Sequence, residues 1–435
     1  MARQERNIMF ATGLECSYPT VEHGKRRDEL ESTKHYTHWR RDFQLCKEIG
    51  ADYVRYGPPY YRMHTAPHQY DWSWTDETLP VMRDMGLIPI IDLCHFGVPD
   101  WVGGFQNTDW PELFADYVGE FSRRYPWISF YTPVNEMLVC ARFSAKHGIW
   151  NEQLKSDQAM VTAITNMCRA THLAMEQILK QCPDAVFFQS EVAEVLLERW
   201  PSTRDEVNFK NELRFVTFDL LYGHAPHAEV ALFLLDNGMS RDRYRWFMDR
   251  GPEARRHCVM GTDYYSRNER LVHPDGSEEG IGSVLGWEAI ADEYFGRYRK
   301  PIMLTETNSM DPDAGPSWLW NLWNNIRHSR SRGVPVLGFT WYSLTDQVDW
   351  DIQLKEIRNK QNPNGLFDLD RNPRPAAQAF RDLTTRYHDL PMIEDFAMGG
   401  IPAPRHGRAP ADDGRTPPEI ERLNPLNHEP AARAL

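Results

Sequence analysis

A run of mainly apolar residues that ends in polar side chains, Ile128-Ser-Phe-Tyr-Thr-Pro-Val-Asn-Glu136 (residues 128–136), decides the fold of this 435-residue chain. Similar runs recur along most of the chain, and several are rich in Val, Ile, Phe and Tyr, as is typical of strands buried on both faces. The eight runs are Ile8–Leu14, Asp52–Tyr56, Ile88–His95, Ile128–Asn135, Ala185–Ser190, Val259–Tyr265, Ile302–Glu306 and Val336–Tyr342.

Amphipathic segments separate these runs. Trp39–Ile49, Ala159–Cys182 and Ser317–Arg330 each place apolar residues near helical spacing, and Pro183 stops the second segment. Eight strands that alternate with helices predict an α/β fold of the (β/α)8, or TIM, barrel type. A doubly wound open sheet is the main alternative. The number of strands and the positions of the polar residues favour the barrel.

The domain organisation is predicted from length and composition. The chain is 41% hydrophobic, which is enough for one large core. We expect residues 1–390 to form a single barrel domain. Residues 391–435 are dense in Pro, Arg, Ala and Gly, and a segment of this composition buries little surface. We expect that tail to be extended or disordered.

The net charge and the cysteine content indicate which classes of partner to exclude and which cellular compartment to expect. The net charge of -13 and pI of about 5.7 argue against nucleic acid or an anionic membrane as a partner, because both require a basic surface. The N-terminal residues MARQERNIMFATG lack the apolar stretch of a signal peptide. Seven scattered cysteines show no CxxC spacing, which favours a reducing compartment. We therefore expect a cytoplasmic protein.

Polar residues gather where the predicted strands end. These residues are Arg55, His95, Asn135, Glu136, Tyr265, Glu306 and Tyr342. In a (β/α)8 barrel the carboxyl ends of the strands meet on one face, and that face carries the active site. A buried charged group is costly unless it is paired. Several such residues on one rim therefore predict one pre-organised site.

Two carboxylates at this rim suggest cleavage of a glycosidic bond. Glu136 ends the fourth strand and Glu306 ends the seventh, and these strand ends face each other across a barrel mouth. One carboxyl group can protonate the leaving oxygen while the other attacks the anomeric carbon, at a separation of roughly 5–5.5 Å in retaining enzymes. The alternative is that one or both glutamates only pair with Arg55 in a structural network.

Six motifs, in the correct order, resemble those of family 1 glycoside hydrolases, the β-glucosidase group. Thr132–Met137 (TPVNEM) resembles the acid/base motif T-x-N-E-P, and Leu304–Asn308 (LTETN) resembles the nucleophile motif I-T-E-N-G. Gly338–Trp350 is similar to the eighth-strand segment of the family. The remaining matches are Val54-Arg-Tyr56, Cys94–Pro99, and Gly365–Asp370 followed by Pro375–Phe380. The resemblance runs from residue 8 to about residue 385.

The resemblance implies a retaining β-glycosidase that cleaves β-linked glycosides through a covalent glycosyl-enzyme intermediate. It implies that Glu136 is the acid/base and Glu306 the nucleophile. It also implies that Arg55 and Tyr265 orient Glu306, and Tyr265 is preferred to Tyr264 because side chains alternate along a strand and Asp263 shares its face. The residues implied to contact the sugar are Asn135, His95, Asp349, Trp350 and Tyr342.

The chain departs from the family pattern in its sugar-binding residues. Pro19 stands where the family has Gln, Tyr342 replaces a Trp, and Asp349 replaces a Glu. We expect these changes to alter which β-linked sugar is bound. The acidic segment Asp349-Trp350-Asp351 should repel a phosphate, so we expect an unphosphorylated glycoside.

Two other functions remain as alternatives. One is a metal-dependent sugar isomerase or deaminase on the same barrel, but only His95 among the histidines ends a strand, and we expect no metal and no organic cofactor. The other is a non-catalytic sugar-binding barrel. Loss of either glutamate would favour it, and both are present.

Overall fold

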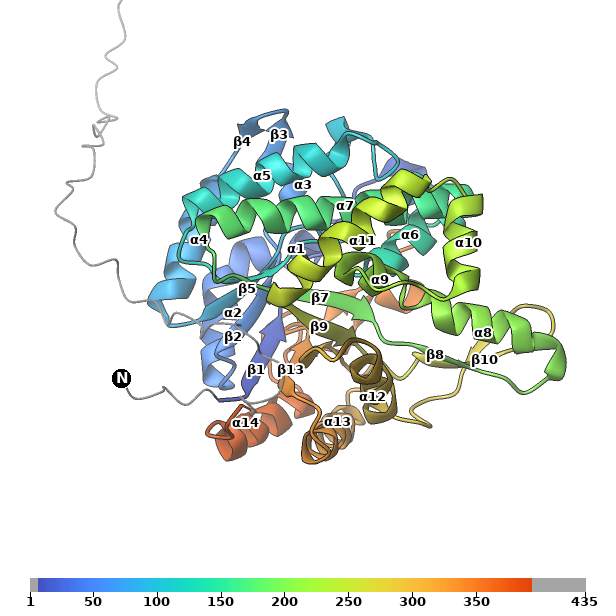
Figure 1. Ribbon diagram of the computed structural model, residues 1–435. Helices are drawn as coiled ribbons and strands as arrows, with labels where there is room; N and C mark the ends of the chain where they lie inside the picture. The colour runs from blue at the N-terminus through green and yellow to red at the C-terminus, as the bar shows by residue number, and fades with distance from the viewer. Residues whose placement is uncertain (1–6, 393–435) are drawn as a thin grey trace, which may run out of the picture.

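The computed structural model describes residues 7–392, which form a closed barrel of parallel strands surrounded by helices (Figure 1). Around the barrel the order is β1-β13-β12-β9-β7-β6-β5-β2. The strands are β1 (Met9–Gly13), β2 (Tyr53–Tyr56), β5 (Ile88–Asp92), β6 (Phe130–Thr132), β7 (Val186–Val192), β9 (Cys258–Asp263), β12 (Ile302–Glu306) and β13 (Val336–Tyr342). Each coincides with one of the eight predicted runs, so the (β/α)8 fold is confirmed.

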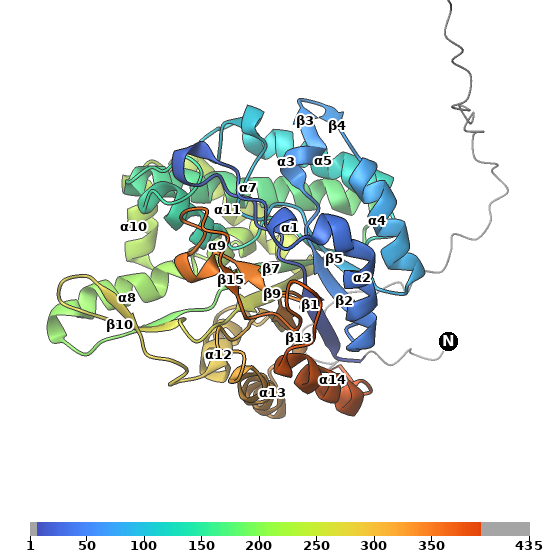
Figure 2. The same ribbon diagram turned by 180° about the vertical axis from the view of Figure 1, so that it is seen from behind.

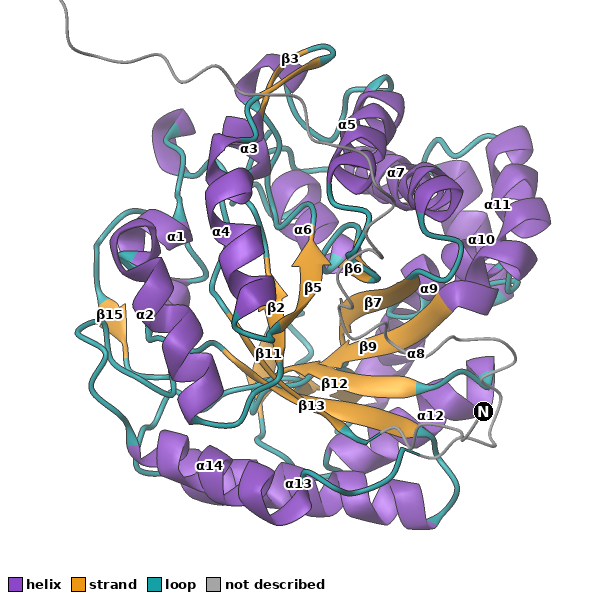
Figure 3. Cartoon of the chain, turned by 90° about the vertical axis from the view of Figure 1, so that its left-hand side faces the viewer, coloured by secondary structure: helices purple, strands orange, loops and turns teal. Residues whose placement is uncertain are grey.

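The helices pack against the outside of the barrel, as Figure 3 shows with the helices in purple and the strands in orange. The longer helices are α2 (His35–Glu48), α4 (Ser73–Asp84), α5 (Trp110–Arg124), α7 (Asp157–Gln181), α8 (Arg204–Leu213), α9 (Val216–Tyr222), α10 (Ala228–Asp236), α11 (Arg241–Ala254), α12 (Trp287–Tyr298), α13 (Gly315–Ser331) and α14 (Pro375–Tyr387). The three helices predicted from the sequence correspond to α2, α7 and α13.

Shorter elements connect these parts. They are the helices α1 (Glu29–Ser32), α3 (Tyr60–Met63) and α6 (Met137–Ala141), the π-helical turn η3 (Arg142–Lys146), and the strands β3 (His64–Ala66), β4 (Gln69–Tyr70), β8 (Val195–Leu197), β10 (Glu269–Val272), β11 (Glu278–Gly280), β14 (Gln347–Val348) and β15 (Gln361–Asn362). Single 3-10 turns lie at Glu22–Gly24, Asp100–Val102, Pro201–Thr203, Arg255–His257 and Trp350–Ile352.

The alternation of side chains along each barrel strand separates two apolar cores. On β1, Met9 and Ala11 point into the barrel, where they belong to a buried cluster with Ile90 and residues of the other strands. Phe10 points outward and packs on Trp323 of α13, with ring centroids 5.5 Å apart. The barrel is thus filled with side chains and the helices cover its outer face, as expected for a (β/α)8 barrel.

Strand β6 is shorter than the run that predicts it. The strand ends at Thr132, and the chain then turns toward α6. The turn remains attached to the barrel because the backbone N–H groups of Asn135 and Glu136 donate to the carbonyl oxygens of Cys94 and Ser190, both at 2.9 Å. Glu136 is thereby fixed at the barrel mouth although it lies beyond the strand.

A long excursion between β7 and β9 contains β8 and helices α8 to α11. Strands β11, β10 and β8 form a separate three-stranded sheet, which projects with α8 from one side of the barrel (Figures 1 and 2). These elements lie beside the barrel mouth and form one wall of the cavity described below.

The two ends of the described segment meet at the base of the barrel. The backbone N–H of Ile8 donates to the carbonyl oxygen of Leu390 at 2.9 Å, and Asn7 pairs with Pro391. The predicted domain boundary at residue 390 is not tested by this contact, and residues 393–435, which make up nearly all of the predicted tail, lie outside the described residues. Within residues 7–392, no helix is long and apolar enough to span a bilayer.

Candidate active site

A cavity of about 620 Å³ opens where the barrel strands end. Glu306 and Tyr342 are the last residues of β12 and β13, and Glu136 follows β6. All three line the cavity, together with His95 and Tyr265. The parallel register brings these residues to one face although the sequence separates them widely.

Glu306 is held by two donors. Arg55 donates to its Oε1, and the Tyr265 hydroxyl donates to its Oε2 at 2.7 Å. The neighbouring Tyr264 points away from the cavity and donates to Glu269, so strand alternation selects Tyr265. Burial, followed by the negative charge of Glu306, raises the pKa of Tyr265 well above its usual value. The phenol therefore stays protonated and can act as a donor.

Arg55 links Glu306 to a buried hydrogen-bond network that contains Asp92 and Asn135. Its guanidinium also donates to Asp92 at 2.9 Å and to the Asn135 side chain. The same Asp92 oxygen is 2.8 Å from His95 Nδ1. Asp92 therefore holds this buried network together. Each charge in the network has a partner, which offsets the cost of burial.

Glu136 differs from Glu306 in having no hydrogen-bond partner for its carboxyl group among the described residues. Its backbone has a left-handed conformation with φ 38°, which a non-glycine residue rarely adopts and which is often found at functional sites. Burial, together with the nearby Asp263 and Glu306, raises the pKa of Glu136 well above its usual value. The raised pKa favours the protonated form, which a general acid requires.

Glu191 fixes the segment that follows Glu136. The carboxylate lies on β7 and accepts from the backbone N–H of Met137 at 3.0 Å and of Leu138 at 3.4 Å. These N–H groups open α6 and have no partner within the helix. Burial raises the pKa of Glu191 to about 7. Glu191 thus positions Glu136 through the backbone and does not line the cavity.

His95 and Asn135 lie beside each other, with 3.1 Å between His95 Nε2 and Asn135 Nδ2. His95 lines the cavity, whereas Asn135 is not among the lining residues. Both His95 ring nitrogens already have protein partners, Asp92 and Asn135. Both residues therefore contribute mainly to holding Arg55 and the aromatic wall in place, and their predicted contacts with a sugar remain predictions.

Aromatic rings form part of the cavity lining. The Tyr342 ring lies parallel to the His95 ring, with centroids 6.0 Å apart, and covers Gly13, where a Cβ atom would be 2.1 Å from the Tyr342 ring. Trp350 also lines the cavity, and its indole Nε1 is buried without a hydrogen-bond partner. An unpaired buried donor beside a cavity is suited to a ligand hydroxyl.

The structure does not place Asp349 at the cavity, and this corrects the prediction that Asp349 contacts the sugar. Its carboxylate accepts from the backbone N–H groups of Arg358 and Asn359 at 2.8 Å each and of Lys360 at 2.7 Å, and it lies 3.4 Å from Arg27. The side chain is fully buried in this loop. The left-handed backbone of Asp349, with φ 58°, turns it away from the sugar-binding side. Asp349 is a structural residue of the loop after β13.

Glu15 and Gln347 line the cavity but were not predicted. The Gln347 amide donates to Glu15 Oε2 at 2.6 Å, and Ser17 donates to Glu15 Oε1 from both its backbone and its hydroxyl. Burial raises the pKa of Glu15. Glu15 follows the first strand as Glu136 follows the fourth, so the strand-end rule could have found it. Pro19, which stands where the family has Gln, does not line the cavity.

One group in the described part of the chain could hold a metal ion. The ligand atoms of Cys16, Asp92 and His95 lie within 4.8 Å of one another. However, Asp92 already accepts from the positively charged Arg55, and a cation beside that guanidinium would be repelled. His95 and Asp92 also bond to each other. These donors fit a hydrogen-bond network better than a metal site.

Comparisons with known proteins agree with this fold. No protein-family model matches the chain. It is 19% identical over 355 residues to a 1,4-beta-D-glucan glucohydrolase of Thermotoga neapolitana, covering 73% of this chain and 82% of that protein. A match to Beta-glucosidase 25 of Oryza sativa subsp. japonica is 28% identical over 114 residues and spans only 23% of each protein.

One solved structure matches this chain over nearly its whole length. The family 1 β-glucosidase from Thermotoga maritima in complex with isofagomine lactam has a TM-score of 0.73 at 15% identity, over 88% of this chain and 98% of that one. The chain therefore has the fold of the family 1 β-glucosidases. The resemblance drawn from its motifs is confirmed at this level.

Proposed function

We propose that this protein is a retaining β-glycoside hydrolase, distantly related to the family 1 β-glucosidases. The observation that carries the proposal is the pair of buried glutamates in one cavity, one with two donors on its carboxylate and one unpartnered with a raised pKa. The relatives' names, β-glucosidase and glucan glucohydrolase, support the same class of reaction.

The mechanism follows from the surroundings of the two carboxyl groups. Arg55 and Tyr265 aim the Glu306 carboxylate at the anomeric carbon, and Glu136 donates its proton to the leaving oxygen. Glu136 then deprotonates a water molecule that releases the sugar from Glu306 with its configuration retained. Each step uses carboxyl groups alone, so we propose that no metal or organic cofactor takes part.

Glycone recognition is assigned to Glu15, Gln347, Trp350 and the Tyr342 ring. The Trp350 indole and the oxygen atoms of Glu15 can bond to sugar hydroxyls, and the Tyr342 ring can pack on the sugar face. Asn135, which the resemblance implies to contact the sugar, acts mainly by holding Arg55. We also propose that the sugar is unphosphorylated, because the carboxyl groups of Glu15 and Glu306 would oppose a phosphate dianion there.

The experiment that tests the proposal is hydrolysis of a panel of aryl β-glycosides, with gluco, galacto, fuco, manno, xylo and glucuronic glycones. We expect turnover of at least one, unchanged by exhaustive chelation, and a loss of about 10⁴-fold or more in kcat for Glu306→Ala. A 2-deoxy-2-fluoro aryl glycoside of the preferred glycone should label the protein at Glu306.

The matched control is Glu229→Gln, a change on the exposed first turn of α10 that should leave turnover unchanged. Activity abolished by chelation and restored by a metal would favour the isomerase or deaminase alternative. Sugar binding without any turnover would favour a non-catalytic sugar-binding barrel.

We further propose a cytoplasmic location. All seven cysteines lie at described positions, and each is buried and outside any disulfide. Fractionation of the source cells, with detection of the protein by antibody, would test this.

A further inference from the structure

Glu15 is a buried carboxylate of the cavity lining, and its hydrogen-bond donors in the described part of the chain are all neutral. The side chain is 1% exposed and forms no ion pair within residues 7–392. Its Oε1 accepts from the backbone N–H and the hydroxyl of Ser17, and its Oε2 accepts from the Gln347 amide. A carboxylate offers about four acceptor positions, so one position on Oε2 is left for a ligand.

The amide of Gln347 is fixed in its role as a donor toward Glu15. Its Oε1 already accepts from the Asn364 side chain at 2.5 Å, and the Asn364 Oδ1 accepts from the Gln347 backbone N–H at 3.1 Å. These two bonds turn the amide so that its Nε2 lies 2.6 Å from Glu15 Oε2. The amide therefore orients Glu15 but brings no positive charge to it.

The charged groups around Glu15 do not balance. Arg55 forms ion pairs with Glu306 and Asp92, and His95 Nδ1 lies 2.8 Å from Asp92. Even with His95 counted as charged, these two cations are shared by three carboxylates once Glu15 is included. Burial raises the pKa of Glu15 above its ordinary value, although the nearby His95 opposes that shift. Glu15 is thus the carboxylate of this group for which the described residues supply no cation.

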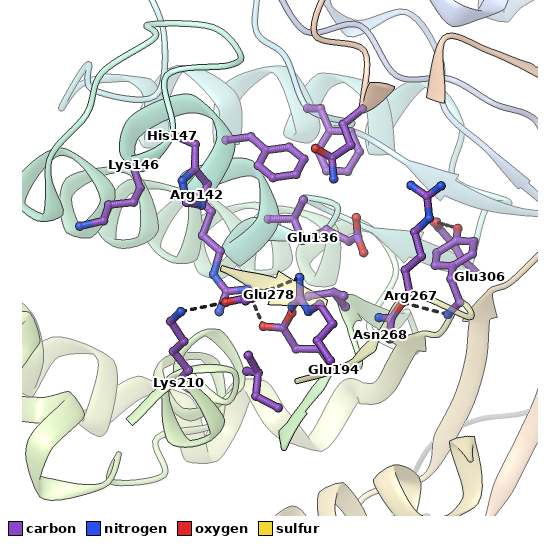
Figure 4. Close-up of a pocket in the computed structure, with 18 of the residues that line it drawn as sticks. Glu136, Arg142, Lys146, His147, Glu194, Lys210, Arg267, Asn268, Glu278 and Glu306 are labelled. Atoms are coloured by element: carbon purple, nitrogen blue, oxygen red, sulfur yellow. Dashed lines mark hydrogen bonds and ion pairs between the residues drawn. The ribbon is translucent and has the colours of Figure 1, made fainter. Parts of the chain in front are cut away.

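The other cations of the cavity lining do not pair with Glu15. Arg267 has no ion pair among residues 7–392, but it is exposed, and water and salt screen its charge. Three further cations pair with carboxylates of their own, and in Figure 4 they lie on the side of Glu136 away from Glu306: Arg142, Lys146 and Lys210. The positive charge that Glu15 lacks must therefore come from a ligand.

We propose that the substrate is a β-glycoside of an amino sugar, whose ammonium group pairs with Glu15. This inference rests on the proposed function and names the substrate class of that same site. The ammonium group donates to the open position on Glu15 Oε2, and a charge-assisted hydrogen bond of this kind is stronger than one from a hydroxyl group. Phe96 and Trp350 line the same cavity, and aromatic faces attract cations. A neutral sugar would instead cover a buried carboxylate without neutralising it, which is costly.

Calorimetric binding of free sugars tests the charge preference without any reaction. The parent sugar is the glycone preferred in the aryl panel, and each amino derivative carries an ammonium group in place of one hydroxyl, at C2, C3, C4 or C6. The derivative whose ammonium group meets Glu15 should bind about tenfold or more tightly than the parent, because close charge pairs in double-mutant cycles couple at least this strongly. Its neutral N-acetyl form should lose this advantage.

The variant Glu15→Gln tests the assignment in turnover, because it keeps the size of the side chain and removes its charge. The ratio of kcat/KM for the amino to the parent aryl β-glycoside should fall about tenfold or more relative to the wild type. The intrinsic reactivity of the two glycosides is the same for both proteins and cancels. The matched control is Glu206→Gln, which removes a different carboxylate of the cavity lining, one on α8 that pairs with Lys210. It should leave the ratio unchanged.

The two measurements separate failure of this inference from failure of the proposed function. Weaker binding of every amino derivative than of the parent sugar by the wild-type protein would overturn the amino sugar, and this comparison does not depend on the folding of a variant. An amino preference that survives in Glu15→Gln would also overturn it. No turnover of any aryl glycoside would overturn the glycosidase, while calorimetry would still report the charge preference of the cavity.

Discussion

Glu136 and Glu306 have the same side chain, and their surroundings give them different tasks. Glu306 accepts from both Arg55 and Tyr265, which hold it as an oriented carboxylate. Glu136 has a buried carboxyl group beside other acids, and its raised pKa favours the protonated form. A pair of acids in contrasting environments is the arrangement by which a single active site provides both a nucleophile and a proton donor.

The alkaline limb of the pH profile should report Glu136. Burial and the neighbouring acids raise its pKa, so kcat/KM should fall as the pH rises through that pKa. Replacing Glu136 by Ala removes this titration, and the limb should flatten for aryl glycosides whose leaving group needs no proton. The pH dependence of kcat/KM for both proteins checks this, and an unchanged alkaline limb in the variant would reject Glu136 as the acid.

Glu15 should contribute strongly to binding of the sugar. Glu15→Gln replaces an acceptor oxygen by an amide donor, and a buried hydrogen-bonding group left unsatisfied costs ~1–3 kcal/mol, so the variant should lower kcat/KM for the preferred glycone by about 5- to 100-fold. The loss should be smaller for the deoxy analogue that lacks the hydroxyl bound by Glu15. Comparison of a deoxy series with the wild type and the variant measures this, and equal losses on every analogue would show that Glu15 is only structural.

At the scale of elements, α6 depends on a residue of a neighbouring strand. Glu191 on β7 accepts from the first N–H groups of α6, directly after Glu136. The helix is only five residues long and cannot fix its own position. The position of the proposed acid therefore depends on the barrel, through one buried carboxyl group.

Titration of Glu191 should lower the free energy of unfolding as the pH rises. Burial raises its pKa from 4.5 to about 7 in the folded protein. The stability that this shift contributes is complete below the unfolded value of 4.5 and is lost as pH rises through about 7. Relative to Glu191→Gln, the wild type should lose about 3 kcal/mol of unfolding free energy between pH 4.5 and 8.

Denaturant unfolding of both proteins across this pH range measures the difference, and other titrating groups cancel in the comparison. Parallel pH dependences would mean that Glu191 does not titrate as stated. Glu191→Ala should also lower kcat while Glu191→Gln retains most of it, because the glutamine oxygen can still accept from α6.

At the scale of the whole molecule, the last described residues close the base of the barrel. Leu390 and Pro391 pair with the start of the chain, Arg330 donates to the Pro391 carbonyl oxygen at 2.5 Å, and Met392 belongs to the apolar cluster inside the barrel. The base and the active site lie at opposite ends of the same strands.

Two truncated chains should distinguish the effect of these contacts on stability from any effect of residues 393–435. A chain that ends at residue 392 should retain the Tm and kcat/KM of the full chain. A chain that ends at residue 386 should lose about 2–5 kcal/mol of unfolding free energy, the usual cost of removing a buried side chain such as Met392. Thermal unfolding and aryl glycoside turnover measure both, and a lower kcat/KM for the 392-residue chain would assign a role in turnover to residues 393–435.

Local patterns in the sequence predict the barrel and the residues at its strand ends. Apolar runs and strand alternation are local signals, so eight strands, Glu136, Glu306, Arg55 and Tyr265 could be located from them. The rest of the site depends on contacts between segments that lie far apart in the sequence. Glu15 and Gln347 meet across 332 positions of sequence, and left-handed backbone turns Asp349 into its own loop. One wall of the cavity forms where an excursion packs beside the barrel, and a local pattern does not encode such long-range packing.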